Sequence, residues 1–233
     1  MISSLLTHLH ATKKWAIDDD PYHWQGVVDN PNVFATWDEV ETCINNPQFF
    51  DMQLVDKTTN RYIELPQYQR AWSSKPFADA RDIKEAFDAG NTLIINNFDW
   101  ISRQKQELLQ QIETFFPNVL SAFHVYCGLS ESKSFKIHED LANNFIVQVE
   151  GVTHWQIYKQ RASYLVDRYP YDVNEKDLDC IIDVDLKPGD MLYIPSRCWH
   201  YAQPMEKRLS VSIPMQHGVP HLKKVDRNYY GIN

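Results

Sequence analysis

The chain has 233 residues, with 23 Lys+Arg against 31 Asp+Glu, and 43% of its residues are hydrophobic. This length is ample for a continuous core, and the absence of an apolar run of about 18 residues excludes a transmembrane helix. A formal net charge of −8 argues against a protein whose main function is to bind nucleic acid. The four cysteines form no CxxC pair and the first residues lack the apolar core of a secretory leader, so we expect a cytoplasmic protein with free thiols.

Helices and irregular segments are predicted for the first 90 or so residues. Thr36 and Glu39 have the spacing of a capping box, and Asn46-Pro47 ends the helix that they begin. The sequence DARDIKEAFDAG predicts a second helix that stops at Gly90. A strand is expected over 92–98 and a helix over 102–116, whereas residues 51–78 show no clear period.

From residue 122 onward the hydrophobic pattern has a period of two. The short β-rich runs are FHVYC, SFKIH, NFIVQVEG, THWQIY, CIIDVDL, MLYIP and RLSVSIP. Pro188-Gly189 fits the centre of a type II turn between two of them. Many short strands with helices gathered at the N-terminal side indicate a mainly β fold, a sandwich or barrel with a helical flank. Trp155 is expected in the barrel core, on the same parity as Phe145 and Val147.

Three residues have the chemistry of a metal site. On a strand, residues i and i+2 project to one face, so His138 and Asp140 are candidates to hold one ion between them. His200 follows in the segment IPSRCWHYAQ, after the Pro-Gly turn and a short strand. Two imidazoles and one carboxylate leave open positions on an octahedral metal, as non-haem Fe(II) oxygenases require.

Several segments together resemble the JmjC/cupin-like 2-oxoglutarate oxygenases, with the nearest similarity to FIH-like asparaginyl hydroxylases and bacterial ribosomal oxygenases. They are AGNTLIINNF, FHVYCGLSESKSFKIHED, NNFIVQVEGVTHWQIY, DVDLKPGDMLYIPSRCWHYA and RLSVSIP, in the family's order over about residues 89–216. The resemblance implies a double-stranded β-helix (cupin or jelly-roll) core over 91–217. An N-terminal flank would cover 1–90 and a tail 218–233.

The resemblance also implies an enzyme. Fe(II) would be held by His138, Asp140 and His200, and 2-oxoglutarate and O₂ would be consumed to hydroxylate a C–H bond, with succinate and CO₂ as co-products. In this family a tyrosine upstream of the HxD motif contacts 2-oxoglutarate, and Tyr126 occupies that place. Asn144 lies where some members have an amide near the co-substrate.

The anchor for the distal carboxylate of 2-oxoglutarate departs from the family's pattern. Thr153 stands where a Lys or Arg is usual, and an anionic tail buried without a cation is costly. Lys136, which shares the parity of His138, and Arg208, in an Arg-x-Ser pair with Ser210, are equally good replacements on sequence grounds. Thr153 and Ser210 would then serve as hydroxyl partners.

Two other functions remain open at this point. One is a cupin-type metal enzyme that does not use 2-oxoglutarate, and the other is a non-catalytic cupin-like binding or sensing module. For the leading interpretation we expect a protein, peptide or amino-acid-like small-molecule substrate, with no role for a membrane. The N-terminal 90 residues and the mouth loops, including the connection 158–180, would form its surface.

Overall fold

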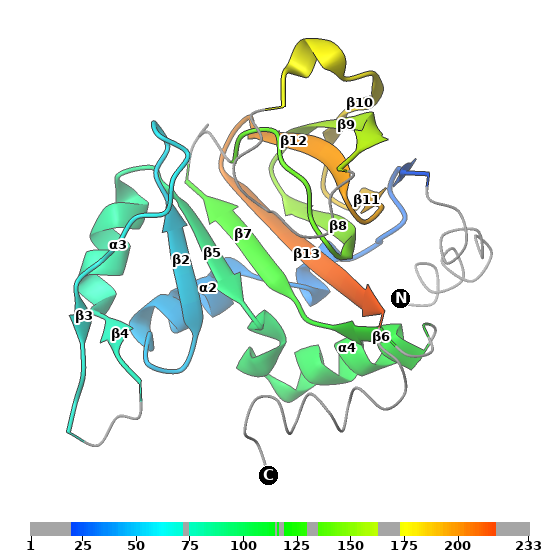
Figure 1. Ribbon diagram of the computed structural model, residues 1–233. Helices are drawn as coiled ribbons and strands as arrows, with labels where there is room; N and C mark the ends of the chain where they lie inside the picture. The colour runs from blue at the N-terminus through cyan, green and yellow to red at the C-terminus, as the bar shows by residue number, and fades with distance from the viewer. Residues whose placement is uncertain are drawn as a thin grey trace.

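The computed structural model describes residues 20–71, 75–114, 116, 119–129, 135–162 and 173–217, and these residues form two antiparallel sheets with helices on one side (Figure 1). The larger sheet has the order β1 (Tyr22–Trp24), β11 (Met191–Ile194), β8 (Asn143–Glu150), β13 (Arg208–His217), β7 (His124–Gly128), β5 (Thr92–Asn96) and β2 (Asp51–Val55), and β6 (Val119–Ser121) also pairs with β13. The smaller sheet has the order β10 (Cys180–Leu186), β9 (Thr153–Arg161) and β12 (Cys198–Pro204). A separate hairpin pairs β3 (Gln67–Tyr68) with β4 (Phe77–Ala78).

The helices are α2 (Trp37–Asn45), α3 (Ala80–Asp88) and α4 (Arg103–Thr114), with short 3₁₀ turns at Pro31–Val33, Phe98–Ile101 and Glu175–Asp177. Both halves of the predicted capping box are present at the start of α2, where Glu39 N–H donates to Thr36 Oγ1 at 3.3 Å and Thr36 N–H donates to Glu39 Oε2 at 2.9 Å. Helix α3 is followed by Gly90 with φ of +90°, as predicted. None of the described helices is long and apolar enough to cross a membrane.

The alternation of side chains on the larger sheet divides the interior into two cores. Phe145 and Val147 of β8 point to the helices and join the large apolar cluster there. Ile146, between them, points to the smaller sheet and packs in a second cluster with Trp155 and Ala202. Trp155 therefore lies in the barrel core, as predicted, but on the opposite side of the larger sheet from Phe145 and Val147.

The predicted mainly β fold with flanking helices is confirmed. The strand predicted for SFKIH is wrong, because within the described part of that segment only His138 makes a β-bridge. Strands β1 and β2 come from the first 90 residues and extend the larger sheet. The domain division at residue 90 stays a prediction, and the tail 218–233 lies outside the described residues.

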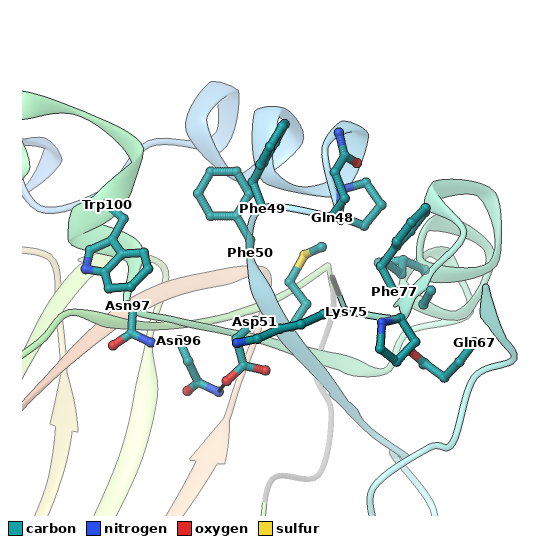
Figure 2. A pocket seen from close by; sticks show the side chains of 15 residues that line it. Gln48, Phe49, Phe50, Asp51, Gln67, Lys75, Phe77, Asn96, Asn97 and Trp100 are labelled. Carbon is teal, nitrogen blue, oxygen red and sulfur yellow. Dashed lines mark hydrogen bonds between the residues drawn. The ribbon is translucent and has the colours of Figure 1, made fainter. Parts of the chain in front are cut away.

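The turn between β10 and β11 has the predicted form. Asp190 N–H donates to the Lys187 carbonyl at 2.9 Å, and Gly189 has φ of +90°. At the other end of the larger sheet, beyond β2, an open hollow lies between that strand and the β3–β4 hairpin (Figure 2). All four cysteines are free thiols.

Candidate functional site

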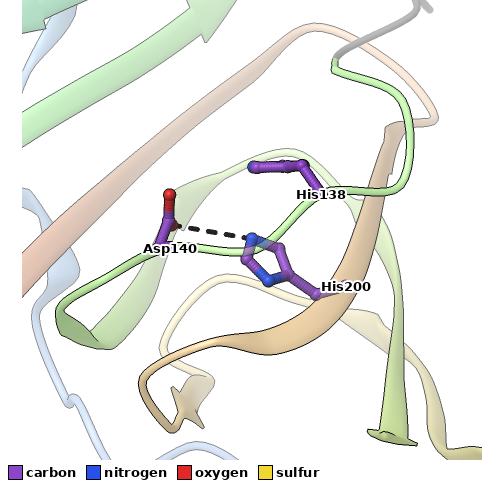
Figure 3. Close-up of side chains that lie close together, drawn as sticks. All are labelled: His138, Asp140 and His200. Carbon is purple, nitrogen blue, oxygen red and sulfur yellow. Dashed lines mark ion pairs between the residues drawn. The ribbon is translucent and has the colours of Figure 1, made fainter. Parts of the chain in front are cut away.

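His138, Asp140 and His200 come together between the two sheets (Figure 3). The first two precede β8 and the third lies on β12, and one ligand atom from each fits within 4.8 Å of the others. His200 Nε2 lies 3.6 Å from Asp140 Oδ2. Two imidazole nitrogens and a carboxylate oxygen are a donor set suited to Fe(II), so the residues fit the predicted ion.

The backbone, rather than a continuous strand, brings the two histidines together. His138 N–H donates to the His200 carbonyl at 3.0 Å, and His200 N–H donates to the His138 carbonyl at 2.9 Å. The two rings lie 4.3 Å apart between centroids. His138 and Asp140 converge because this bridge fixes the segment beside β12, not because they alternate on a strand.

Each histidine is held in the tautomer that a metal requires. His138 Nδ1 lies 2.8 Å from the Lys136 carbonyl, and His200 Nδ1 lies 2.9 Å from the Cys198 carbonyl. A carbonyl oxygen only accepts, so both Nδ1 atoms carry hydrogen and both Nε2 lone pairs are free to bind an ion. Burial, together with the nearby His138, lowers the pKa of His200 to about 4, which keeps its ring neutral at neutral pH.

Asn144 orients the carboxylate of the centre. Its Nδ2 donates to Asp140 Oδ2 at 2.7 Å, and its Oδ1 accepts a hydrogen bond from Ser212 Oγ at 3.4 Å. Asn144 is buried on β8. The amide predicted to lie near the co-substrate therefore contacts a candidate metal ligand directly.

A cavity adjoins the centre and has walls from both sheets. The lining residues are Tyr126, Phe135, His138, Asp140, Ile146, Trp155, Ile194, His200, Ala202, Arg208, Ser210 and Ser212. Tyr126, Arg208 and Ser210 are predicted contacts of 2-oxoglutarate, and all three are present. Burial and the nearby Asp140 raise the pKa of Tyr126, so its hydroxyl stays a hydrogen-bond donor.

Arg208 is the buried cation of this cavity. Its side chain is 2% exposed, and its Nε and Nη2 atoms have no hydrogen-bond partner within the described residues. Burial lowers its pKa to about 10, which still leaves the guanidinium charged at neutral pH. A buried charge without a counter-ion is unfavourable, so an anion bound in this cavity would be stabilised by Arg208.

Lys136 lies elsewhere. Its side chain is exposed and borders a hollow outside the cavity, with Thr59, Arg61 and Phe135. Of the two cations that the sequence left open, the structure brings Arg208 and not Lys136 into the cavity beside the triad.

Two hydroxyls predicted to assist the anchor are both buried. Ser210 Oγ donates to Gln148 Oε1 at 2.8 Å and lines the cavity. Thr153 Oγ1 has no hydrogen-bond partner within the described residues and is fully buried on β9. Thr153 does not line the cavity, although Trp155 on the same face of β9 does.

Ser212 and Gln148 were not predicted from the sequence to contribute to the site, and Trp155 was predicted only as a core residue. Ser212 follows Arg208 and Ser210 at spacings of two on β13, so strand parity alone would have placed it on the cavity wall. Gln148 lacks such a signal, because its role is to accept from Ser210 and donate to the carbonyls of Glu150 and Gly151.

The sequence profile of the JmjC domain matches residues 94–221, which is more than half of the chain. The chain belongs to the JmjC family. JmjC oxygenases use Fe(II), 2-oxoglutarate and O₂, and the prediction of the family is confirmed.

One relative is the bifunctional lysine-specific demethylase and histidyl-hydroxylase NO66 from Drosophila persimilis. It is 30% identical over 153 residues, which cover 64% of this chain and 22% of that protein. Ribosomal oxygenase 2 from Mus musculus is 29% identical over 124 residues, covering 52% and 26% of the two chains. The chain thus spans only about a quarter or less of these relatives.

The fold is also similar to that of the ribosomal oxygenase YcfD from Escherichia coli, solved in complex with cobalt and 2-oxoglutarate. That structure superposes with a TM-score of 0.59 at 16% identity, over 91% of this chain and 52% of the other. A second structure of E. coli YcfD superposes with a TM-score of 0.63. These similarities confirm the JmjC/cupin-like fold.

Proposed function

We propose that this protein is an Fe(II)- and 2-oxoglutarate-dependent oxygenase that hydroxylates a C–H bond. The observation that carries the proposal is the coexistence, in one cavity, of a His138–Asp140–His200 donor set and the buried guanidinium of Arg208, whose Nε and Nη2 atoms have no hydrogen-bond partner among the described residues. A metal site alone would suit any cupin-type enzyme. A metal site that shares its cavity with a buried cation suits a co-substrate that binds metal at one end and carries a carboxylate at the other.

His138, Asp140 and His200 would hold the iron through two Nε2 atoms and a carboxylate oxygen. When bound, iron and 2-oxoglutarate together activate O₂ for insertion into a C–H bond, and the co-products are succinate and CO₂. The backbone carbonyls that accept from the Nδ1–H groups keep both lone pairs directed at the ion. Asn144 fixes the carboxylate in place.

Arg208 would pair with the distal carboxylate of 2-oxoglutarate, with Ser210 as a hydroxyl partner and Tyr126 as a further donor. Thr153, on β9 of the smaller sheet, would support this end only indirectly, because it does not line the cavity. Trp155, Ile146 and Ile194 would exclude water from the reacting end of the cavity, which strengthens each of these polar contacts.

The test compares two cations in the purified chain loaded anaerobically with Fe(II). We expect 2-oxoglutarate to produce the visible charge-transfer absorption of its iron chelate, and Arg208→Ala to weaken this titration by about one to two powers of ten, since a hydrogen bond to a charged group contributes roughly 1.5–3 kcal/mol. Lys136→Ala is the matched control and should titrate like the parent. An unchanged titration in Arg208→Ala would favour a cupin-type enzyme without 2-oxoglutarate, and absence of succinate in the parent would favour a binding or sensing module.

The proposed substrate class and cellular location follow from the relatives and from the sequence. A protein or peptide side chain is the preferred substrate, because one relative is named as a lysine-specific demethylase and histidyl-hydroxylase and another as a ribosomal oxygenase. An amino-acid-like small molecule is the alternative. The cytoplasmic location remains a proposal from the composition.

A further inference from the structure

We propose that an extended acidic segment of a partner polypeptide binds beside β2, pairs with the backbone of Met52 and leads one of its residues to the His138–Asp140–His200 centre. This inference rests on the proposed oxygenase function and deepens it, since it names the surface and the chemistry of the substrate. Four steps support it, and they concern the shape of the surface, its backbone edge, its path to the centre and its charge.

Two neighbouring hollows form one groove beside β2. A hollow of about 420 Å³ and another of about 220 Å³ share four walls, Met52, Gln67, Ala78 and Ile83. We call the two together the β2 groove. In Figure 2, Trp100 stands at one end of the larger hollow, Phe77 and Gln67 stand at the other, and Phe49 lies between them.

The backbone of β2 offers hydrogen bonds on this side. Within the described residues β2 is the last strand of the larger sheet, and the β3–β4 hairpin across the groove does not pair with it. Residues 61–63 already occupy this edge beyond Leu54, where Val55 and Tyr62 form an antiparallel bridge. Ile63 N–H donates to the Leu54 carbonyl at 2.9 Å, which shows that the polar groups of Leu54 face this edge. Strand alternation directs the N–H and C=O of Met52 the same way, where the described chain gives them no partner. Unpaired backbone groups at a sheet edge pair readily with an added segment, so one residue of a partner can pair with Met52.

Exposed aromatic rings lie at both ends of the groove. Phe49 and Trp100 are 71% and 67% exposed at one end, and Tyr62 is 58% exposed at the other. Large exposed aromatic side chains grouped along one hollow are typical of an interaction surface. The five residues of β2 span roughly 17 Å at about 3.3 Å each, so an extended segment of about five residues, paired with the backbone of β2 only at Met52, would reach from one end to the other.

The groove leads to the candidate metal centre. The ring of Tyr62 contacts that of Phe135 at 5.6 Å between centroids, and Phe135 contacts the His138 ring at 5.4 Å. Phe135 and His138 line both the inner cavity and an outer hollow of about 490 Å³. A strand that leaves the β2 groove past Tyr62 therefore enters the outer hollow and meets the centre at His138.

The positive charge of the outer hollow favours an acidic partner segment. Arg61 and Lys136 are exposed on its wall, and neither forms an ion pair with a residue that the structure describes. These two cations stand out on a chain of net charge −8. Acidic side chains next to the residue presented to the metal would be complementary to them.

The experiment uses the full chain loaded with Mn(II) and 2-oxoglutarate, which binds substrate without turnover. The probe is a randomised library of synthetic dodecapeptides, and the retained peptides are identified by mass spectrometry. We expect enrichment of Asp or Glu, reversal of that preference in Arg61→Glu, and at least about a tenfold loss of retention in Phe49→Ala, the size typical of an interface hot spot. Ile181→Ala, which removes an exposed side chain on β10, is the matched control and should retain the same peptides as the parent.

A second measurement tests the backbone pairing without altering the protein. In the best-retained peptide, N-methylation of one residue at a time should abolish binding at a single position and leave it unchanged at the neighbouring ones, since one residue pairs with Met52. Equal effects at all positions, or retention that is indifferent to Arg61→Glu and Phe49→Ala, would overturn the proposal. Succinate formation without peptide tests the oxygenase separately, so a chain that consumes 2-oxoglutarate but retains no peptide overturns the groove alone.

Discussion

The backbone N–H of Arg197 donates a hydrogen bond of 2.6 Å to the carbonyl oxygen of Asp140, and Arg197 does so from a left-handed conformation with φ of +60°. Arg197 belongs to the turn that leads into β12, three residues before His200. A residue with a side chain costs of order 1 kcal/mol in this region of backbone space. The turn therefore bears strain at the point where it fixes the backbone of the candidate carboxylate ligand.

Replacement of Arg197 should separate the strain from the hydrogen bond. Arg197→Gly keeps the N–H and adopts this conformation freely, so we expect a free energy of unfolding equal to the parent's or up to about 1 kcal/mol higher. Arg197→Val should lower it by more than about 1 kcal/mol and weaken Mn(II) binding, because β-branched residues resist positive φ. Urea unfolding and calorimetric titration measure both. Equal Mn(II) affinity in the Gly and Val variants would show that the turn does not position Asp140.

Loss of the Asn144 amide should weaken the metal centre. Asn144→Ala removes the donor to Asp140 Oδ2, and loss of such a partner typically costs about 10–100-fold in metal affinity. Competition with a chelating dye measures this. Asn46→Ala, at the end of α2 and away from the centre, is the control and should bind Mn(II) like the parent. Parent-like affinity in Asn144→Ala would reduce the amide to a packing role.

Removal of the buried cation should stabilise the ligand-free protein. Arg208→Met keeps the length of the side chain and removes an unpaired buried charge, and exchange of buried charges for apolar groups is often neutral or stabilising by about 1–4 kcal/mol. The same variant should lose the rise in melting temperature that succinate gives the parent. If succinate still raised the melting temperature of Arg208→Met, Arg208 would not be the residue that binds the distal carboxylate.

The metal-free protein should lose stability as the pH falls from about 6.5 to about 4. The ring of His200 titrates in the unfolded chain near the ordinary histidine pKa of 6.5, whereas in the folded chain burial lowers its pKa to about 4. Between these pH values His200 binds a proton in the unfolded state but not in the folded state. Its contribution to the free energy of unfolding is therefore complete above pH 6.5 and is lost as the pH falls through 4. The loss amounts to roughly 3 kcal/mol at about 1.4 kcal/mol per pKa unit.

Urea midpoints at several pH values measure this slope, and His200→Gln should flatten it. Part of the slope should survive in that variant, because burial also lowers the pKa of His124. A slope that is the same in the parent and in His200→Gln would show that the ring is protonated in the folded protein.

Local chemistry explains which elements were predictable. The capping box at Thr36, the Pro188-Gly189 turn and the alternating strands from residue 122 are encoded by neighbours in sequence, and they are present. Strand β2 was missed, because DMQLV alternates poorly and is a strand only through its pairing with β5. The strand predicted for SFKIH failed because its last residue pairs with a distant His200 and not with an adjacent hairpin.

The same limit applies to the site. The three candidate metal ligands were identified by residue type and by a resemblance, and the structure brings them together. Strand alternation could not decide whether Lys136 or Arg208 faces the cavity, because alternation holds only within a strand and Lys136 does not lie in one. Arg208 lies in β13, where alternation does direct it to the cavity.

The three candidate ligands differ in their access to solvent. The side chain of His200 is 3% exposed, whereas that of Asp140 is 45% exposed. An ion would therefore arrive and depart past the carboxylate, with the buried imidazole as the last contact broken. Chelators would strip the centre from this side, so bulk introduced beside Asp140 would slow the exchange of metal ions in both directions and leave the equilibrium unchanged.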